Sequence, residues 1–106
     1  MNKYSLFKIK PGKRKMWVDW CKKLMGEHFQ EGIVSIIEED LVRERCIIFG
    51  EGDESYVFYE HITLPGKDKK LFNPKRQLNL EHRKMLDECL DYDDRLFGDI
   101  GYDFKI

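Results

Sequence analysis

Residues 41 to 62 read LVRERCIIFGEGDESYVFYEHI and contain the clearest indication of secondary structure in the chain. β-Branched and aromatic side chains, which favour strands, dominate residues 41–49 and 55–62. The short connection between these two runs contains two glycines, which is typical of a β-hairpin. The sequence therefore predicts two adjacent antiparallel strands in the middle of the chain.

The charges on these strands predict how the strands are aligned. A register that pairs Glu44 with Glu60 would place two carboxylates opposite each other, which is unfavourable. A shift by one residue in either direction puts an arginine opposite Glu60 and places Glu44 opposite Tyr59 or His61. We therefore expect one of these two shifted registers.

Side chains alternate between the two faces of a strand, which sorts the hairpin residues into two sets. The set without arginine is the better candidate to lie beneath helices. Its members are Val42, Glu44, Cys46, Ile48, Val57, Tyr59 and His61, whereas Arg43, Arg45, Phe58, Glu60 and Ile62 belong to the opposite face.

The segments before the hairpin predict a strand and a helix. Residues 4–10 are rich in strand formers and end at the turn signal Pro11-Gly12. After Lys13, apolar side chains recur at steps of three and four residues, as on an amphipathic helix that packs on a sheet. Residues 33–39 fit either a strand or a helix, and we favour a continuation of the helix.

The segments after the hairpin predict a loop, a second helix and a fourth strand. Residues 64–78 combine turn signals with several lysines and are expected to form a mobile basic loop. Asn79 offers an N-cap to a helix that contains His82 on its apolar stripe. Residues 96–104 can supply the last strand.

The order strand, helix, strand, strand, helix, strand predicts an α+β protein of the ferredoxin-like βαββαβ type. In that arrangement a four-stranded antiparallel sheet carries both helices on one face. The other face would stay bare, although apolar residues are available for it. A second subunit stacked sheet to sheet would cover it, so we expect a homodimer.

Four short segments within residues 4–97 carry a resemblance to a known family. They are residues 8–13 (KIKPGK) before a tryptophan-bearing helix, the pair of glutamates at 38–39, Glu44 in a strand, and residues 79–82 (NLEH) at the start of a helix. Together they resemble a small uncharacterised bacterial family of unknown function in the ferredoxin-like dimeric α/β-barrel superfamily. The resemblance implies that fold and a dimeric barrel, and it implies no catalytic roles, because the family has no assigned reaction.

Composition predicts a single domain that spans residues 1–106, with one core and a strongly charged surface, since 42% of the residues are hydrophobic and 37% are charged. The net charge of −1 hides alternating blocks: residues 1–25 and 62–84 are basic, and residues 26–61 and 85–106 are acidic. Such blocks offer no uniform basic surface, so we expect no nucleic-acid partner.

The three cysteines, Cys21, Cys46 and Cys89, are widely spaced and form no C-x-x-C pair. We expect buried free thiols and therefore a cytoplasmic protein. No apolar run is long enough for a membrane span, and no secretion signal is evident, so we expect no membrane partner.

Polar side chains from the hairpin and the second helix are predicted to converge in a cleft between sheet and helices. Glu44, Tyr59 and His61 share the inward face, His82 lies on the inward stripe, and Trp20 would form an apolar wall. A carboxylate raises the pKa of a neighbouring imidazole, so Glu44, His61 and His82 are candidate catalytic residues, and Tyr59 and Trp20 are candidate ligand-binding residues. Alternatively, the glutamate and the histidines only satisfy one another at the edge of the core.

No motif indicates a cofactor or a metal. His28 and Glu31 have helical spacing, but a single pair does not make a metal site. Two function classes remain: a non-catalytic dimeric module that binds a small organic ligand or a partner, and a cofactor-independent enzyme that transfers protons in the cleft. We favour the first, because no residue pattern fixes a nucleophile, a metal or a cofactor.

Overall fold

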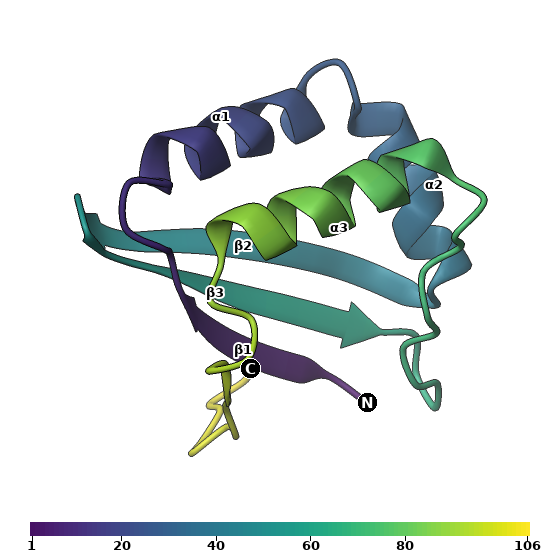
Figure 1. Ribbon diagram of the computed structural model, residues 1–106. Coiled ribbons are helices and arrows are strands. Elements are labelled where there is room, and N and C mark those ends of the chain that lie inside the picture. The colour runs from purple at the N-terminus through teal and green to yellow at the C-terminus, as the bar shows by residue number, and fades with distance from the viewer.

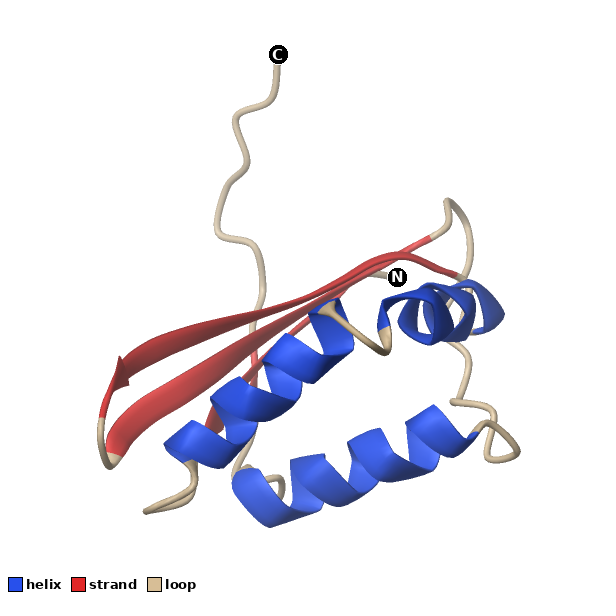
Figure 2. Cartoon of the chain, turned by 90° about the horizontal axis from the view of Figure 1, so that it is seen from above, coloured by secondary structure: helices blue, strands red, loops and turns tan.

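The computed structural model describes residues 1–106 as a four-stranded antiparallel sheet with three helices on one face (Figure 1 and Figure 2). We call the face beneath the helices the inner face and the opposite one the outer face. The predicted α+β class is confirmed, and the strand order β2-β3-β1-β4 is compatible with a ferredoxin-like fold. The strands are β1 (Lys3–Lys8), β2 (Leu41–Glu51), β3 (Glu54–Thr63) and β4 (Leu96–Phe97), and the helices are α1 (Arg14–Met25), α2 (Phe29–Glu38) and α3 (Gln77–Cys89).

The hairpin of β2 and β3 has one of the two expected registers. Glu44 pairs with His61 and Arg45 pairs with Glu60, with 3.1 Å between the guanidinium and carboxylate atoms of the latter pair. The ladder continues to Glu51 and Glu54, so that only Gly52 and Asp53 form the turn. The backbone of Gly52 has a φ of 53°, a left-handed conformation that glycine adopts without strain.

The predicted inward position of Val42 is wrong. A β-bulge between Leu41 and Arg43 places one extra residue on β2, so that Leu41 is buried and Val42 is 54% exposed. The remaining inward residues of β2, Cys46 and Ile48, pack against the core as expected.

Residues 33–39 are helical up to Glu38, as favoured, but they belong to a separate helix. The chain turns between α1 and α2 at Gly26, whose N–H bonds to the carbonyl of Lys23. A Cβ atom at position 26 would lie 3.2 Å from the carbonyl oxygen of Lys22, so glycine suits this close approach. α2 therefore crosses the end of the sheet instead of extending α1 (Figure 1).

Two predicted boundaries near the end of the chain are wrong. α3 begins at Gln77 with Arg76 at the N-cap position, because the side chain of Asn79 is engaged by Ser35 and by the carbonyl of Asn73 instead of capping the helix. The fourth strand covers residues 96–97 and not 96–104. In this antiparallel pair, later residues of β4 lie opposite earlier residues of β1. Because β1 begins at Lys3, almost no strand is left to pair with residues beyond 98.

The core lies between the inner face and the helices. Trp17 and Trp20 of α1 are both buried there, as expected for residues that anchor a helix to a sheet. The cysteines are free; Cys89 is buried, and Cys21 and Cys46 are half-buried. None of the helices is both long and apolar enough to cross a membrane. The buried hydrophobic cluster consists of Phe7, Ile9, Trp17, Trp20, Val57, Tyr59, Leu78, Cys89 and Leu90.

Candidate ligand pocket

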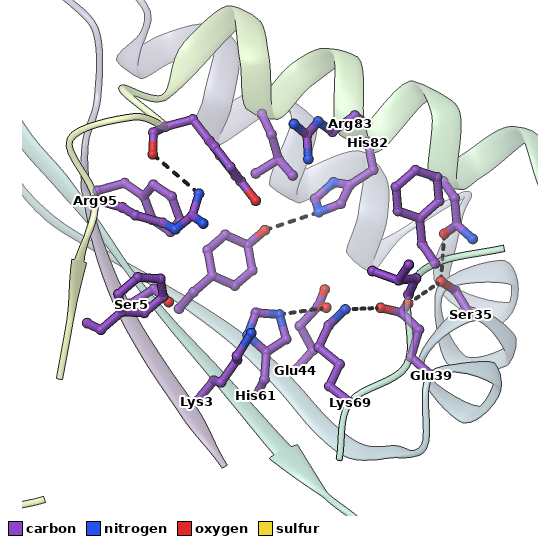
Figure 3. Close-up of a pocket in the computed structure, with 18 residues that line it drawn as sticks. Lys3, Ser5, Ser35, Glu39, Glu44, His61, Lys69, His82, Arg83 and Arg95 are labelled. Carbon is purple, nitrogen blue, oxygen red and sulfur yellow. Dashed lines mark hydrogen bonds and ion pairs between the residues drawn. The ribbon is translucent and has the colours of Figure 1, made fainter. Parts of the chain in front are cut away.

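A cavity of about 290 Å³ lies between the inner face and the elements that cover it (Figure 3). Ligand pockets commonly measure roughly 300–1,000 Å³, so this volume suits a small molecule. The structure brings together four of the five predicted site residues, since Glu44, Tyr59, His61 and His82 all line the cavity. Trp20 does not line it, so the predicted apolar wall is not formed by this side chain.

Trp20 instead acts on the cavity through His82. Its indole N–H donates a hydrogen bond to Nδ1 of His82 over 2.9 Å. Because an indole can only donate, Nδ1 must be the unprotonated nitrogen of a neutral imidazole, and Nε2 carries the hydrogen. Nε2 lies 3.2 Å from the hydroxyl oxygen of Tyr59, which accepts this hydrogen. The hydroxyl hydrogen of Tyr59 is then available to an acceptor in the cavity.

Burial holds both groups in their uncharged forms. It lowers the pKa of His82 from the ordinary value of 6.5, although the carboxylates of Glu44 and Glu39 act in the opposite direction. Burial, together with the negative charge of Glu44, also raises the pKa of Tyr59 well above 10.0. The expectation that a nearby carboxylate raises the pKa of the catalytic imidazole is therefore wrong for His82, because desolvation outweighs the charge.

Glu44 pairs with the other imidazole of the site. Its Oε1 lies 3.2 Å from Nε2 of His61, its register partner across the hairpin. Burial by itself raises the pKa of Glu44, but the hydrogen bond from His61 and nearby positive charge, including that of Lys69, outweigh burial and lower the pKa overall. Glu44 is therefore ionised at neutral pH. Nδ1 of His61 is buried and has no hydrogen-bond partner.

The basic loop of residues 66–75 forms one wall of the cavity. Lys69, Leu71 and Phe72 of this loop line it. The loop region is tied to the acidic end of α2, so that opposite charge blocks of the sequence meet here. The ion pairs are Lys69 with Glu39 at 2.7 Å, Lys70 with Asp40 at 3.2 Å, and Arg76 with Glu38 at 2.8 Å.

Hydrogen-bonding groups around Ser35 occupy the end of the cavity near α2 (Figure 3). Oγ of Ser35 lies 2.6 Å from Oδ1 of Asn79 and 3.1 Å from Oε2 of Glu39. A hydroxyl group has one hydrogen, so Ser35 donates to only one of these acceptors at a time. This end of the cavity can therefore exchange hydrogen bonds with a polar group of a ligand.

Positive charge outweighs negative charge around the cavity. Arg95 has no carboxylate partner, and its guanidinium lies 4.2 Å from the centroid of the Tyr92 ring. Arg83 lies 4.6 Å from the same centroid and makes only a 3.4 Å contact with Asp87. The charged lining consists of the cations Lys3, Lys69, Arg83 and Arg95 and the carboxylates Glu39 and Glu44.

None of these four cations was predicted from the sequence as a residue of the site. Arg83 lies on α3 and Arg95 lies just before β4. Both reach the cavity only through the tertiary packing of these segments, which no local spacing in the sequence indicates. The position of Lys69 could have been predicted, because the acidic residues 38–40 and the basic loop have complementary charge.

The structure contains no group of three or more His, Cys, Asp or Glu side chains placed to hold a metal ion. Comparisons of the chain with protein-family models, with curated proteins and with solved structures find no match. A function can therefore be inferred only from the geometry and chemistry of the cavity.

Proposed function

We propose that this protein is a homodimeric, non-catalytic module that binds a small organic anion in the cavity. The observation that carries the proposal is the guanidinium of Arg95, which has no carboxylate partner and makes only a 3.4 Å hydrogen bond to the carbonyl of Tyr92. It lies at one end of a cavity whose lining has more cations than carboxylates (Figure 3). A cation without a carboxylate partner beside a partly desolvated space attracts an anion strongly, because the surrounding medium screens the interaction less than water does.

The protonation states of the pocket support binding over proton transfer. His82 uses both ring nitrogens in hydrogen bonds with Trp20 and Tyr59, so it has no free lone pair for a proton. Tyr59 stays protonated and can donate to a ligand, and Glu44 stays ionised. Groups with fixed protonation states recognise a ligand well, whereas a general base needs a pKa near the working pH.

The cavity lining indicates what else the anion carries. Aromatic and aliphatic side chains make up much of the wall, so the ligand would have an apolar body next to its charge. A small aromatic or aliphatic carboxylate meets both requirements. The apolar part of the wall comprises Phe7, Leu71, Phe72, Leu86, Tyr92 and Phe97, with the ring of Tyr59 beside them.

The dimer belongs to the same proposal. The strand order is compatible with a ferredoxin-like layout, and the helices leave the outer face uncovered (Figure 2). Two such faces stacked on each other would form the dimeric α/β barrel that the sequence resemblance implies.

Thermal unfolding in the presence of matched ligands tests the proposed function. Small carboxylates such as benzoate would be compared with their uncharged amides, for example benzamide. A ligand present at about ten times its Kd stabilises the folded state by about 1.4 kcal/mol, which raises the Tm of a domain of this size by roughly 6–10 °C. The proposal predicts such shifts with carboxylates only. Equal shifts with the amides, or none with either class, would contradict it.

A second candidate function rests on His61. Nε2 of His61 contacts the carboxylate of Glu44, and Nδ1 of the same ring has no hydrogen-bond partner. A general base that is oriented by a carboxylate has this arrangement. The protein would then be a cofactor-independent enzyme that removes a proton from a small organic acid, with Glu44 as the orienting group.

Deuterium exchange tests this second candidate. Pyruvate in D₂O exchanges its methyl hydrogens slowly, and proton NMR follows the loss of the signal. An enzyme of this kind would accelerate the exchange, and Glu44→Gln and His61→Asn would both remove the acceleration. If the native protein leaves the exchange rate of pyruvate and of related 2-oxo acids unchanged, the proton-transfer function loses its support.

A further inference from the structure

The last eight residues alternate between apolar and other side chains. Ile100, Tyr102, Phe104 and Ile106 are separated by one residue each. In an extended chain, residues with this spacing point to the same side. Ile100, Tyr102 and Phe104 are 55%, 80% and 93% exposed, and Tyr102 and Phe104 lie 5.3 Å apart, ring centroid to ring centroid. This segment therefore presents an apolar stripe that its own chain does not cover.

The segment leaves the body of the protein on a particular side. After β4, the N–H of Gly98 still bonds to the carbonyl of Tyr4, and the chain then departs from the sheet. Figure 2 shows it projecting from the outer face, away from the helices. A molecule that docked on the outer face would therefore meet this segment.

The outer face carries a continuous apolar region. Leu6 pairs with Leu96 on one side and with Phe58 on the other, and Phe58 pairs with Ile47. These four side chains form one row across all four strands, and Phe49 and Tyr56 are register partners in the row beside it. Leu96, Leu6 and Phe49 are 64%, 38% and 51% exposed. Apolar faces of this extent on a protein usually mark an interaction surface.

We infer that residues 99–106 form an arm that lies across the outer face of a second copy of this chain. The inference rests on the proposed dimer and adds to it the segment that closes the interface. In a two-fold dimer the contact is made twice, because the arm of each subunit emerges beside the sheet of the other.

The reach of the arm fits this partner. Eight residues in extended conformation span about 26 Å, and the outermost strands of a four-stranded sheet lie about 14 Å apart. The arm can therefore cross the whole row of apolar side chains on the facing sheet.

The charges also fit. Asp99 and Asp103 point to the side of the arm opposite the apolar stripe if the segment is extended. The exposed residues Lys8 and Arg43 lie on the outer face, and neither makes an ion pair with its own chain. With Lys105 included, the side-chain charges of the arm sum to −1, so the arm is compatible with a face that carries unpaired cations, while its apolar stripe makes the contact with the second copy.

Sedimentation equilibrium on the full chain and on two matched variants tests the arm. Ile100→Ser with Phe104→Ser removes half of the apolar stripe. Asp99→Ser with Lys105→Ser changes the same number of arm residues and keeps both the net charge and the stripe. Circular dichroism would show that each variant keeps the fold, which is expected because the changed side chains are exposed.

The arm predicts that the full chain is a dimer and that the apolar double variant dissociates at least about tenfold more readily. The polar double variant should stay within about threefold of the full chain. If both variants dimerise as tightly as the full chain, or if both dimerise equally more weakly, the proposed arm contact is wrong, and the dimer is not contradicted. A full chain that is monomeric at high concentration overturns the arm and the dimer together, and leaves anion binding in the cavity unaffected.

A photo-cross-link locates the arm. A benzophenone side chain introduced at position 102 would be activated in a mixture of ¹⁵N-labelled and unlabelled protein, so that mass spectrometry separates links within a chain from links between chains. The inference predicts links between chains to peptides of β2 or β3. Links only within one chain, or links to helices of the partner, would contradict it.

Discussion

The indole N–H of Trp20 points at Nδ1 of His82 over 2.9 Å, and this single contact decides which nitrogen of the imidazole carries the hydrogen. The hydrogen must reside on Nε2, where it is donated to Tyr59. We therefore predict that long-range ¹H–¹⁵N NMR spectra show His82 as a neutral ring protonated on Nε2 at pH 7. A ring protonated on Nδ1, or on both nitrogens, would contradict the chain of hydrogen bonds described for the pocket.

The same contact can be tested by substitution. Trp20→Phe keeps an aromatic ring but removes the donor, so that the buried Nδ1 of His82 loses its partner. Trp17→Phe is the matched control, because Trp17 is also buried and its indole N–H meets no oxygen or nitrogen acceptor. Both changes leave a cavity of similar size. We expect Trp20→Phe to lower the free energy of unfolding by about 1–3 kcal/mol more than Trp17→Phe, measured by urea denaturation. Equal losses would show that packing, and not the hydrogen bond, accounts for the effect.

Stability should depend on pH through His82. Its pKa is lowered in the folded protein by burial, so the unfolded chain binds the proton first as the pH falls below about 6.5. The free energy of unfolding should therefore decrease between pH 7 and pH 5, by at most about 1.4 kcal/mol per pH unit for one proton. His82→Asn removes the titrating group and should show a shallower decrease. Glu44 does not disturb this range, because its lowered pKa confines its own contribution to pH values below about 4.5. A variant with the same slope as the native protein would contradict the assignment.

Removing the negative charge of Glu44 should affect the affinity for an anion in the opposite direction to removing one of the cations. Glu44→Gln keeps an oxygen that can accept the hydrogen bond from His61, so the fold should be retained. The change removes a negative charge from the cavity lining, and an anion should bind at least as tightly as to the native protein. Isothermal titration with benzoate measures this. Loss of benzoate binding in a folded Glu44→Gln variant would argue against an anion as the ligand.

Much of the site could be predicted because its signals are local in sequence. The register of the hairpin follows from where Glu44, Glu60 and the arginines stand on two neighbouring strands, and His82 follows from the spacing of one helix. These two periodic patterns were sufficient to place Glu44, Tyr59, His61 and His82 on the surfaces that face each other. The helical assignment of residues 33–39 had the same basis.

What could not be predicted depends on contacts between distant segments. The bulge at Val42 accompanies the burial of Leu41, and the early end of β4 follows from the start of its partner strand β1 at Lys3. The bond between Trp20 and His82 requires α1 and α3 to lie side by side. Arg95 reaches the cavity only through the pairing of β4 with β1. These contacts join segments that are far apart in the chain, so no periodic pattern in the sequence indicates them.

Titration of ¹⁵N-labelled protein with benzoate shows whether an anion binds beside Arg95. Arg95→Gln removes the unpaired charge, and Arg43→Gln removes an exposed arginine from the outer face as a matched control. We predict that benzoate shifts the amide signals of residues around the cavity, that Arg95→Gln weakens binding about tenfold or more, and that Arg43→Gln leaves it unchanged. Benzamide should bind far more weakly. Shifts confined to other parts of the protein, or equal affinity of benzoate for the native protein and for Arg95→Gln, would contradict an anion site beside Arg95.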